Sequence, residues 1–225
     1  MLHTLVGGAG ADSIDGGADI DVIDLGSETL GFAWTVTSGN TVFGSDSLTG
    51  IEGVLGGSGN DTLIGNTGDN VLGGGAGNDV IDGGTGDDTL KGGDGLDTLL
   101  GGSGSDSMLG EAGADSLSGG DGNDTLDGGD DADTLMGGAG DDLLQVATVD
   151  AATKGNMTDF FKIDGGTGVD TLEFTSAGTM DFTQLRNDLL ENVEIIQLGA
   201  DNQTLTLNHL DVLSMTGDTN TAVQN

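Results

Sequence analysis

The sequence predicts an all-β protein, a parallel β-solenoid in which two nine-residue units form each coil. Three observations favour this fold. A nine-residue pattern of glycines, one aspartate and one aliphatic recurs along the chain. The eighth position of every copy is apolar, as a short strand with one buried face requires. The 225 residues include 46 Gly and only 3% aromatic residues, which leaves few large side chains for a globular core.

The repeat occurs thirteen times. Two copies start at Gly7 and Gly16, ten run without a break from Gly56 to Gln145, and one starts at Gly165. Nine copies keep an intact GGxGxD. Positions seven to nine are expected to form a short strand, with position eight pointing inward and its neighbours outward. The inward residues are Ile14, Ile23, Leu63, Leu72, Ile81, Leu90, Leu99, Met108, Leu117, Leu126, Leu135, Leu144 and Leu172.

The polar part of the repeat has the chemistry of a cation site. Glycines at positions one, two and four let the chain turn through positive φ angles and leave backbone carbonyl groups uncovered. Aspartate at position six brings a hard carboxylate oxygen, which calcium prefers. Alternate copies should stack about 4.8 Å apart, so the position-six side chains form two files. One file holds Asp61, Asp79, Asp97, Asp115 and Asp133, and the other holds Asn70, Asp88, Asp106, Asp124 and Asp142.

The pattern GGxGxDxUx, in which U is a large aliphatic residue, resembles the glycine-rich nonapeptide of the repeats-in-toxin (RTX) family. As strict repeat the resemblance covers about half of the chain. It implies a right-handed parallel β-roll loaded with calcium, roughly eight ions or more if each gap between neighbouring aspartates holds one. The expected ligands are Asp12, Asp21, Asp61, Asp79, Asp88, Asp97, Asp106, Asp115, Asp124, Asp133, Asp142 and Asp170, with the backbone carbonyls of Gly74, Gly77, Gly83, Gly86, Gly92, Gly95, Gly101, Gly104, Gly119 and Gly122.

The charge supports a dependence on metal. The chain has 39 Asp and Glu against 4 Lys and Arg, a formal net charge of −35, so we expect it to bind neither nucleic acid nor an anionic membrane surface. An acidic disordered chain is the alternative, but the acids recur in register with glycines and aliphatics. Two carboxylates about 5 Å apart repel by roughly 3 kcal/mol at an effective dielectric near 20. We therefore expect calcium binding to drive folding.

Five substitutions interrupt the pattern. Asn70 replaces the aspartate, Asn66 and Glu111 replace the second glycine, and Asp19 and Asp131 replace the fourth glycine. These copies are expected to stack through their aliphatic residue. At Asn70 we expect stacking without full calcium occupancy.

Four regions are predicted: short N-terminal repeats (1–24), a non-repeat β insert (25–55), the main calcium roll (56–145), and an insert, last repeat and C-terminal β capping region (146–225). In the first insert, segments 32–36 and 41–43 favour strands around a turn at 38–40, and these strands are expected to continue the solenoid with wider coils. Trp34 is expected to be a core filler or cap rather than a binding platform. The pair at 160–161, both Phe, is expected to cover an aliphatic edge.

The tail is predicted to add further parallel coils. Its segment 189–217, beginning LLENVEIIQ, echoes LTGIEGVLG at 48–56. Residues 184–190 are expected to form a short helix, and Phe174 and Phe182 to cap the solenoid. The tail resembles those of large bacterial RTX adhesins, just ahead of the secretion signal, so the chain is expected to be a fragment of such a protein.

Catalytic motifs are not found. The chain contains no HExxH, GxSxG or P-loop, no Cys and no Tyr, and its two histidines, His3 and His209, lie far apart, His209 as an expected exposed strand residue. The expected function is a non-enzymatic, monomeric, calcium-binding module. It would lie in a type I-secreted adhesin, extracellular or on the bacterial cell surface, without membrane insertion, and the parent protein would hold any surface ligand. The alternatives are a roll appended to a secreted RTX protease, lipase or toxin, and an ice-binding segment with the irregular file Thr62, Thr98 and Thr134.

Overall fold

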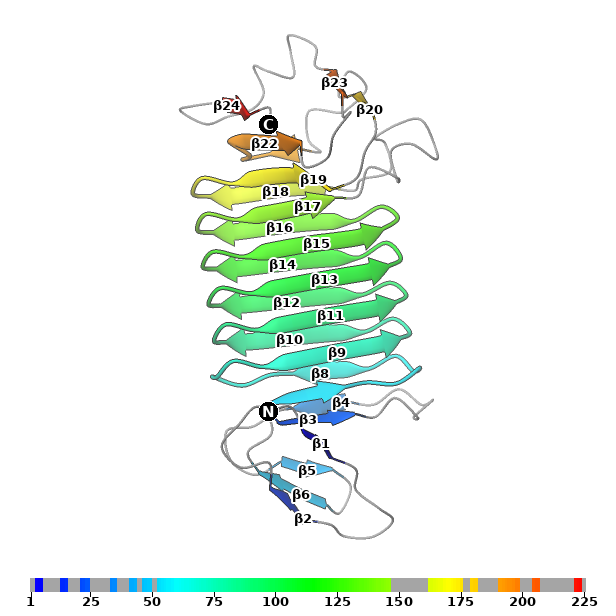
Figure 1. The fold of residues 1–225 in the computed structure, drawn as a ribbon. Coiled ribbons are helices and arrows are strands. Elements are labelled where there is room, and N and C mark those ends of the chain that lie inside the picture. The colour runs from blue at the N-terminus through cyan, green and yellow to red at the C-terminus, as the bar shows by residue number, and fades with distance from the viewer. Residues whose placement is uncertain are drawn as a thin grey trace.

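The computed structural model describes residues 52–146, 162–175 and 190–198, together with the backbone of short strands outside these ranges. All regular secondary structure in the described residues is β-strand. In the repeat region the strands stack one above another in a solenoid, with connecting turns along its two edges (Figure 1). The predicted all-β parallel solenoid, of the β-roll type, is confirmed.

Two parallel sheets form the solenoid. The larger sheet has the order β1 (His3–Leu5), β3 (Asp21–Asp24), β7 (Gly53–Leu55), β9 (Val71–Ala76), β11 (Thr89–Asp94), β13 (Ser107–Ala112), β15 (Thr125–Asp130), β17 (Leu143–Val146), β19 (Thr171–Phe174), β22 (Ile195–Leu198) and β24 (Thr221–Val223). The second sheet runs in the order β4 (Ala33–Thr35), β8 (Thr62–Ile64), β10 (Val80–Thr85), β12 (Thr98–Ser103), β14 (Ser116–Asp121), β16 (Thr134–Ala139), β18 (Lys162–Thr167) and β21 (Leu190–Glu191). Consecutive repeats alternate between the two sheets, so two nonapeptides make one coil as predicted.

The strands of the roll are longer than the three residues expected from the pattern. Strand β12 covers positions seven to nine of one copy and positions one to three of the next. Parallel pairing continues through the glycines, because Gly102 lies in register with Gly84 and Gly120. The turn is thereby confined to positions four to six.

The core is a single file of aliphatic side chains along each sheet. Every described position-eight residue is buried, with 2% or less of its surface exposed, as the period of nine predicts. These residues are Leu63, Leu72, Ile81, Leu90, Leu99, Met108, Leu117, Leu126, Leu135, Leu144 and Leu172. Each such burial stabilises the fold by about 1.5–3 kcal/mol. Positions seven and nine lie on the outer faces, as expected, with patterns such as the alternation in β10.

The glycines divide into two structural roles. From Gly75 onward, the described glycines at positions two and four have positive φ, for example 112° at Gly102 and 134° at Gly104, so the prediction of left-handed backbone is confirmed there. It is wrong for position one, where Gly101 has no positive φ. A methyl group on Gly101 would instead collide with Oδ2 of Asp106 and the carbonyl oxygen of Gly119. Position one needs glycine for space, next to the acidic side chain.

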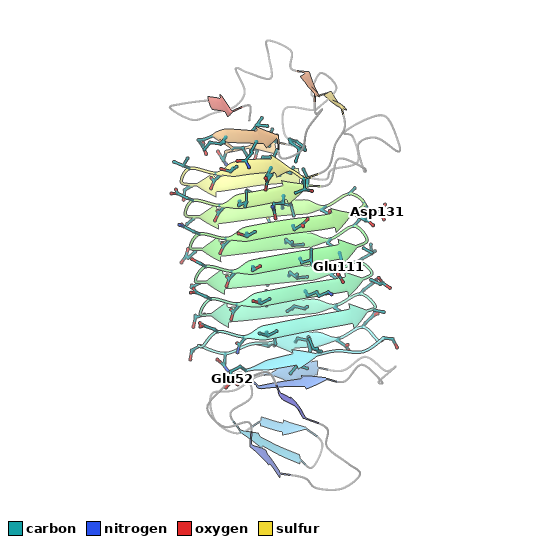
Figure 2. The ribbon with its side chains drawn as sticks, in the orientation of Figure 1. Glu52, Glu111 and Asp131 are labelled. Carbon is teal, nitrogen blue, oxygen red and sulfur yellow. The ribbon has the colours of Figure 1, made fainter. Side chains whose placement is uncertain are left out.

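Two replaced glycines keep the repeat backbone in spite of their side chains. Glu111 has a φ of 80° and pairs in register with Gly93 and Gly129, and Asp131 has a φ of 76° (Figure 2). Both therefore hold a conformation that L-residues with a Cβ disfavour. These copies still stack through their aliphatic residues, as predicted.

The first insert only partly continues the solenoid. Strand β4 joins the second sheet, and its Trp34 lies in register with the core residue Leu63, while β7 joins the larger sheet. Strands β5 (Thr41–Phe43) and β6 (Asp46–Thr49) instead pair antiparallel with each other. Together with β2 (Ser13–Asp15), which pairs parallel with β6, they form a separate sheet, so the prediction is wrong for them. Only two residues separate β5 from β6, a length typical of a hairpin rather than of a solenoid coil. The expected turn at 38–40 lies outside the described residues.

The tail adds parallel strands, as predicted. Strand β22 pairs with β19, and β24 pairs with β22, while β20 (Thr179–Asp181) and β23 (Thr204–Thr206) form a separate parallel pair. Of the helix expected over 184–190, the structure describes only Leu190, which lies in strand β21. Phe174 is fully buried, whereas Phe182, His209 and the Phe pair at 160–161 lie outside the described residues.

Register is maintained across the second insert. Leu135 pairs with Ile163 and Leu144 with Leu172, 28 residues apart, in the same way that copies 18 residues apart pair earlier in the roll. Among the described residues, there is no helix long and apolar enough to cross a lipid bilayer.

Candidate metal centres

The position-six side chains form two continuous hydrogen-bonded files, one along each edge of the roll. In each file a position-six backbone N–H donates to Oδ1 of the aspartate in the next coil, 18 residues later in the uninterrupted repeats and 28 residues later from Asp142 to Asp170. Asp79 N lies 2.7 Å from Asp97 Oδ1 and Asp88 N lies 2.8 Å from Asp106 Oδ1. The first file runs through Asp61, Asp79, Asp97, Asp115 and Asp133, and the second through Asn70, Asp88, Asp106, Asp124, Asp142 and Asp170.

In eight of these aspartates the second carboxylate oxygen is buried without a hydrogen-bond partner. The position-six side chains are at most 3% exposed. Oδ2 makes no hydrogen bond in Asp79, Asp88, Asp97, Asp106, Asp115, Asp124, Asp142 and Asp170. A buried carboxylate oxygen without a donor is costly, and the feature recurs coil after coil.

Backbone carbonyl oxygens lie beside most of these free carboxylate oxygens. The space above Gly101 lies between Oδ2 of Asp106 and the carbonyl oxygen of Gly119 in the next coil. Above Gly119, Oδ2 of Asp124 and the carbonyl of Gly137 are placed in the same way. We call each such space a cradle. Its two oxygen atoms, one from a carboxylate and one from a carbonyl group, could both be metal ligands, and no side chain fills the space because position one is glycine.

The structure locates most of the carbonyl groups predicted from the sequence. Those at position one face the preceding coil in Gly74, Gly83, Gly101 and Gly119, and those at position four lie against the following coil in Gly77, Gly86, Gly95, Gly104 and Gly122. The carbonyl of Gly92 stays a prediction. Sequence reasoning missed four equivalent carbonyls that the nine-residue spacing could have identified, those of Gly110, Gly128, Gly137 and Gly165.

Two predicted ligands are not placed at side-chain level. Asp12 lies outside the described residues. Asp21 is the first residue of β3, in register with His3, and its backbone alone is described. Both stay predictions as ligands, as do the assignments of the other aspartates to bound ions.

The electrostatics of the files disfavour bare carboxylates. Burial raises the pKa of Asp79, Asp88, Asp115, Asp124 and Asp170 from an ordinary value of 3.8 to about 6. Neighbouring carboxylates add to the increase, and the hydrogen bond from the preceding coil opposes it. The pKa values of Asp97, Asp106 and Asp142 are raised by burial in the same direction. Each of these eight aspartates therefore favours a proton or a cation next to it.

The donor set indicates which cation. Among the described residues, no three His, Cys, Asp or Glu side chains come together as they would in a cage made of side chains alone. Each cradle instead combines carboxylate with backbone carbonyl oxygen. Hard oxygen donors of this kind suit calcium and not zinc or copper.

Asn70 closes one file at its N-terminal end. Its Nδ2 donates to the carbonyl oxygen of Glu52 at 2.9 Å, and its Oδ1 accepts from the backbone N–H of Asn66 at 2.7 Å (Glu52 is labelled in Figure 2). Asparagine thus supplies a donor where the preceding coil presents a carbonyl. Because this side chain is neutral and satisfied, the geometry supports the expectation of reduced calcium occupancy here.

Comparison with known families agrees with this geometry. The model of the RTX calcium-binding nonapeptide repeat (4 copies) matches residues 4–28, 55–90, 73–108, 82–117 and 109–144, about half of the chain in total. The chain belongs to the RTX calcium-binding nonapeptide repeat family. No curated protein matches it. The RTX module is accordingly a calcium-binding β-roll. Its buried aspartates, with Oδ1 hydrogen-bonded and Oδ2 without a partner, fit this role.

Proposed function

We propose that this RTX module folds when it binds calcium and serves as a non-catalytic structural module in a secreted bacterial protein. The observation that carries the proposal is the buried Oδ2 atom without a partner, repeated in eight aspartates. The hydrogen bond to Oδ1 does not explain these residues, because asparagine could accept it equally well. A charged side chain is needed only if a cation occupies the cradle.

The energetic argument leads to the same conclusion. A pKa of about 6 in place of 3.8 corresponds to about 3 kcal/mol of destabilisation for each ionised aspartate. Several such groups together match the whole stability of an ordinary domain, about 5–15 kcal/mol. Calcium would reverse the sign of this contribution, so its binding energy would become folding energy.

The proposed setting is outside the cell. Sites in extracellular modules bind calcium at about 10⁻⁴–10⁻³ M, so millimolar calcium outside would fold the chain and low cytosolic calcium would keep it unfolded for type I export. We favour an adhesin as the parent protein, because the tail of the chain continues the roll with further parallel strands. An appended roll of a protease, lipase or toxin is the alternative, and the flanking sequence of the parent would distinguish them.

Far-ultraviolet circular dichroism during a calcium titration of chelator-treated protein tests the proposal, with magnesium as control. We expect a change from coil to β signal with calcium and little change with magnesium, because magnesium demands a near-ideal octahedron and gives up its water ligands reluctantly. A chain that is fully β-folded in chelator and unaffected by calcium would overturn the proposal.

A further inference from the structure

We infer that the module holds one more calcium site beyond its last nonapeptide, in the gap between Asp170 and Glu194. The inference extends the proposed calcium function to a segment with no GGxGxD. The second file does not end at Asp170, because the backbone N–H of Asp170 donates to Oε2 of Glu194 at 3.0 Å. Strand β22 places Ile195 in register with Thr171, so Glu194 occupies position six of one more coil.

A backbone carbonyl is also in place. The space above Gly165 lies between Oδ2 of Asp170 and the carbonyl oxygen of Asn192. In the preceding coil, the space above Gly137 lies between Oδ2 of Asp142 and the carbonyl oxygen of Gly165. Asn192 therefore presents its carbonyl in the same way as a position-one glycine of the repeat.

This turn reaches the same arrangement with fewer residues. Six residues separate Asp164 from Thr171, whereas three separate their register partners, Glu191 and Ile195. Asn192 makes the turn with a φ of 52°, a conformation that asparagine tolerates better than most residues. Its Nδ2 donates to Oδ1 of Asp164 at 2.7 Å, which fixes the orientation of the segment.

The gap between Asp170 and Glu194 brings two carboxylates together without a positive charge from the ion pairs of the described residues. Asp170 is fully buried, and its Oδ2 has no hydrogen-bond partner. Glu194 places a second carboxylate at the next level of the file. Among the ion pairs of the described residues, Lys162 pairs with Asp164 and Glu191 and not with these two carboxylates. A hard divalent cation bound by both carboxylates and the carbonyl of Asn192 would supply the missing charge.

A purely structural role for Glu194 makes a different prediction. If Glu194 only accepts the N–H of Asp170, then glutamine serves as well, because its Oε1 is also an acceptor. If Glu194 is a ligand, the loss of its charge removes one ion. Glu194→Gln therefore separates the two roles while keeping the size of the side chain and the hydrogen bond.

The test is the number of calcium ions bound by the full chain, measured by native mass spectrometry and by equilibrium dialysis, for wild type, E194Q and E191Q. Glu191→Gln is the matched control, because it removes the same charge from the same turn at a half-exposed side chain paired with Lys162. We expect E194Q to bind one ion fewer than wild type and E191Q to bind the same number.

Equal numbers in all three proteins would overturn the inference and leave the proposed function intact. A loss of several ions in E194Q would also overturn it, since Glu194 would then support the whole roll rather than one gap. A wild type that binds no calcium would overturn both, and is the outcome that identifies failure of the proposed function itself.

Discussion

Protons should partly replace calcium in folding the RTX module. The perturbation is acidification of metal-free protein from neutral pH to about pH 4, near the ordinary pKa of aspartate. Five buried aspartates, Asp79, Asp88, Asp115, Asp124 and Asp170, have folded-state pKa values of about 6. Protonation removes their charge and gives each one a donor that can reach a neighbouring carbonyl oxygen.

The direction and size of the effect follow from linkage. Because the folded-state pKa of about 6 exceeds the unfolded value of 3.8, the stabilisation is fully present below about pH 4 and is lost as the pH rises through about 6. Raising the pKa from 3.8 to about 6 corresponds to about 3 kcal/mol for each group. The five groups together amount to on the order of 15 kcal/mol, as much as an ordinary domain's stability. The metal-free roll should thus be unfolded at neutral pH and gain β structure on acidification.

The assay is far-ultraviolet circular dichroism across this pH range in calcium-free buffer. Sedimentation must accompany it, since the pI of about 4.1 brings the net charge close to zero and favours association. Calcium-loaded protein is the control and should respond in the opposite sense, losing ions as protons compete for the same oxygen atoms. A β signal that does not grow on acidification, or that grows only in sedimenting material, would refute the reasoning.

Three pairs of variants test separate parts of the site. Asp124→Asn keeps the acceptor for the backbone N–H of the preceding coil. In a calcium titration followed by circular dichroism, it should raise the calcium concentration for half-folding about tenfold, a change of about 1.4 kcal/mol. The control Asp121→Asn, at an exposed residue of the same repeat, should leave this titration unchanged. Gly101→Ala places a methyl group against Asp106 Oδ2 and should prevent calcium-dependent folding, whereas Gly68→Ala meets only ordinary contact and should not; equal behaviour would contradict the cradle. At position 111, where φ is 80°, glycine should be more stable than alanine to denaturant by about 1 kcal/mol in calcium, and the reverse order would exclude backbone strain.

The solenoid could be predicted because its period is visible in single residues. An aliphatic at every ninth position, as in Leu90 and Leu99, fixes both the strand and its buried face. Two copies in each coil then bring residues 18 apart together, so the spacing alone places Asp79 and Asp97 in one file, as their hydrogen bond confirms. The pattern also identifies the position-six residues as the acidic part of the turn.

Other features of the site depend on atoms that a residue pattern does not distinguish. The sequence does not indicate that Oδ1 pairs with backbone while Oδ2 stays free, nor that Gly101 is needed for space rather than for its φ angle. Glu194 was missed because its turn is three residues shorter than a repeat, so the period fails although the register continues. The echo between LLENVEIIQ and LTGIEGVLG was the available signal, since both place a glutamate, Glu194 and Glu52, just before a strand of the larger sheet.

The unbroken register between β16 and β18 has a consequence for engineering. Leu135 meets Ile163 as if one ordinary coil lay between them, although their separation is 28 residues rather than 18. The closure entropy of a flexible connection grows slowly, by about 0.6 kcal/mol for each doubling of its length. The boundary between two coils is therefore a suitable point for grafting foreign sequence, and a reporter or binding peptide inserted between Val146 and Lys162 should leave the register of the coils on either side intact.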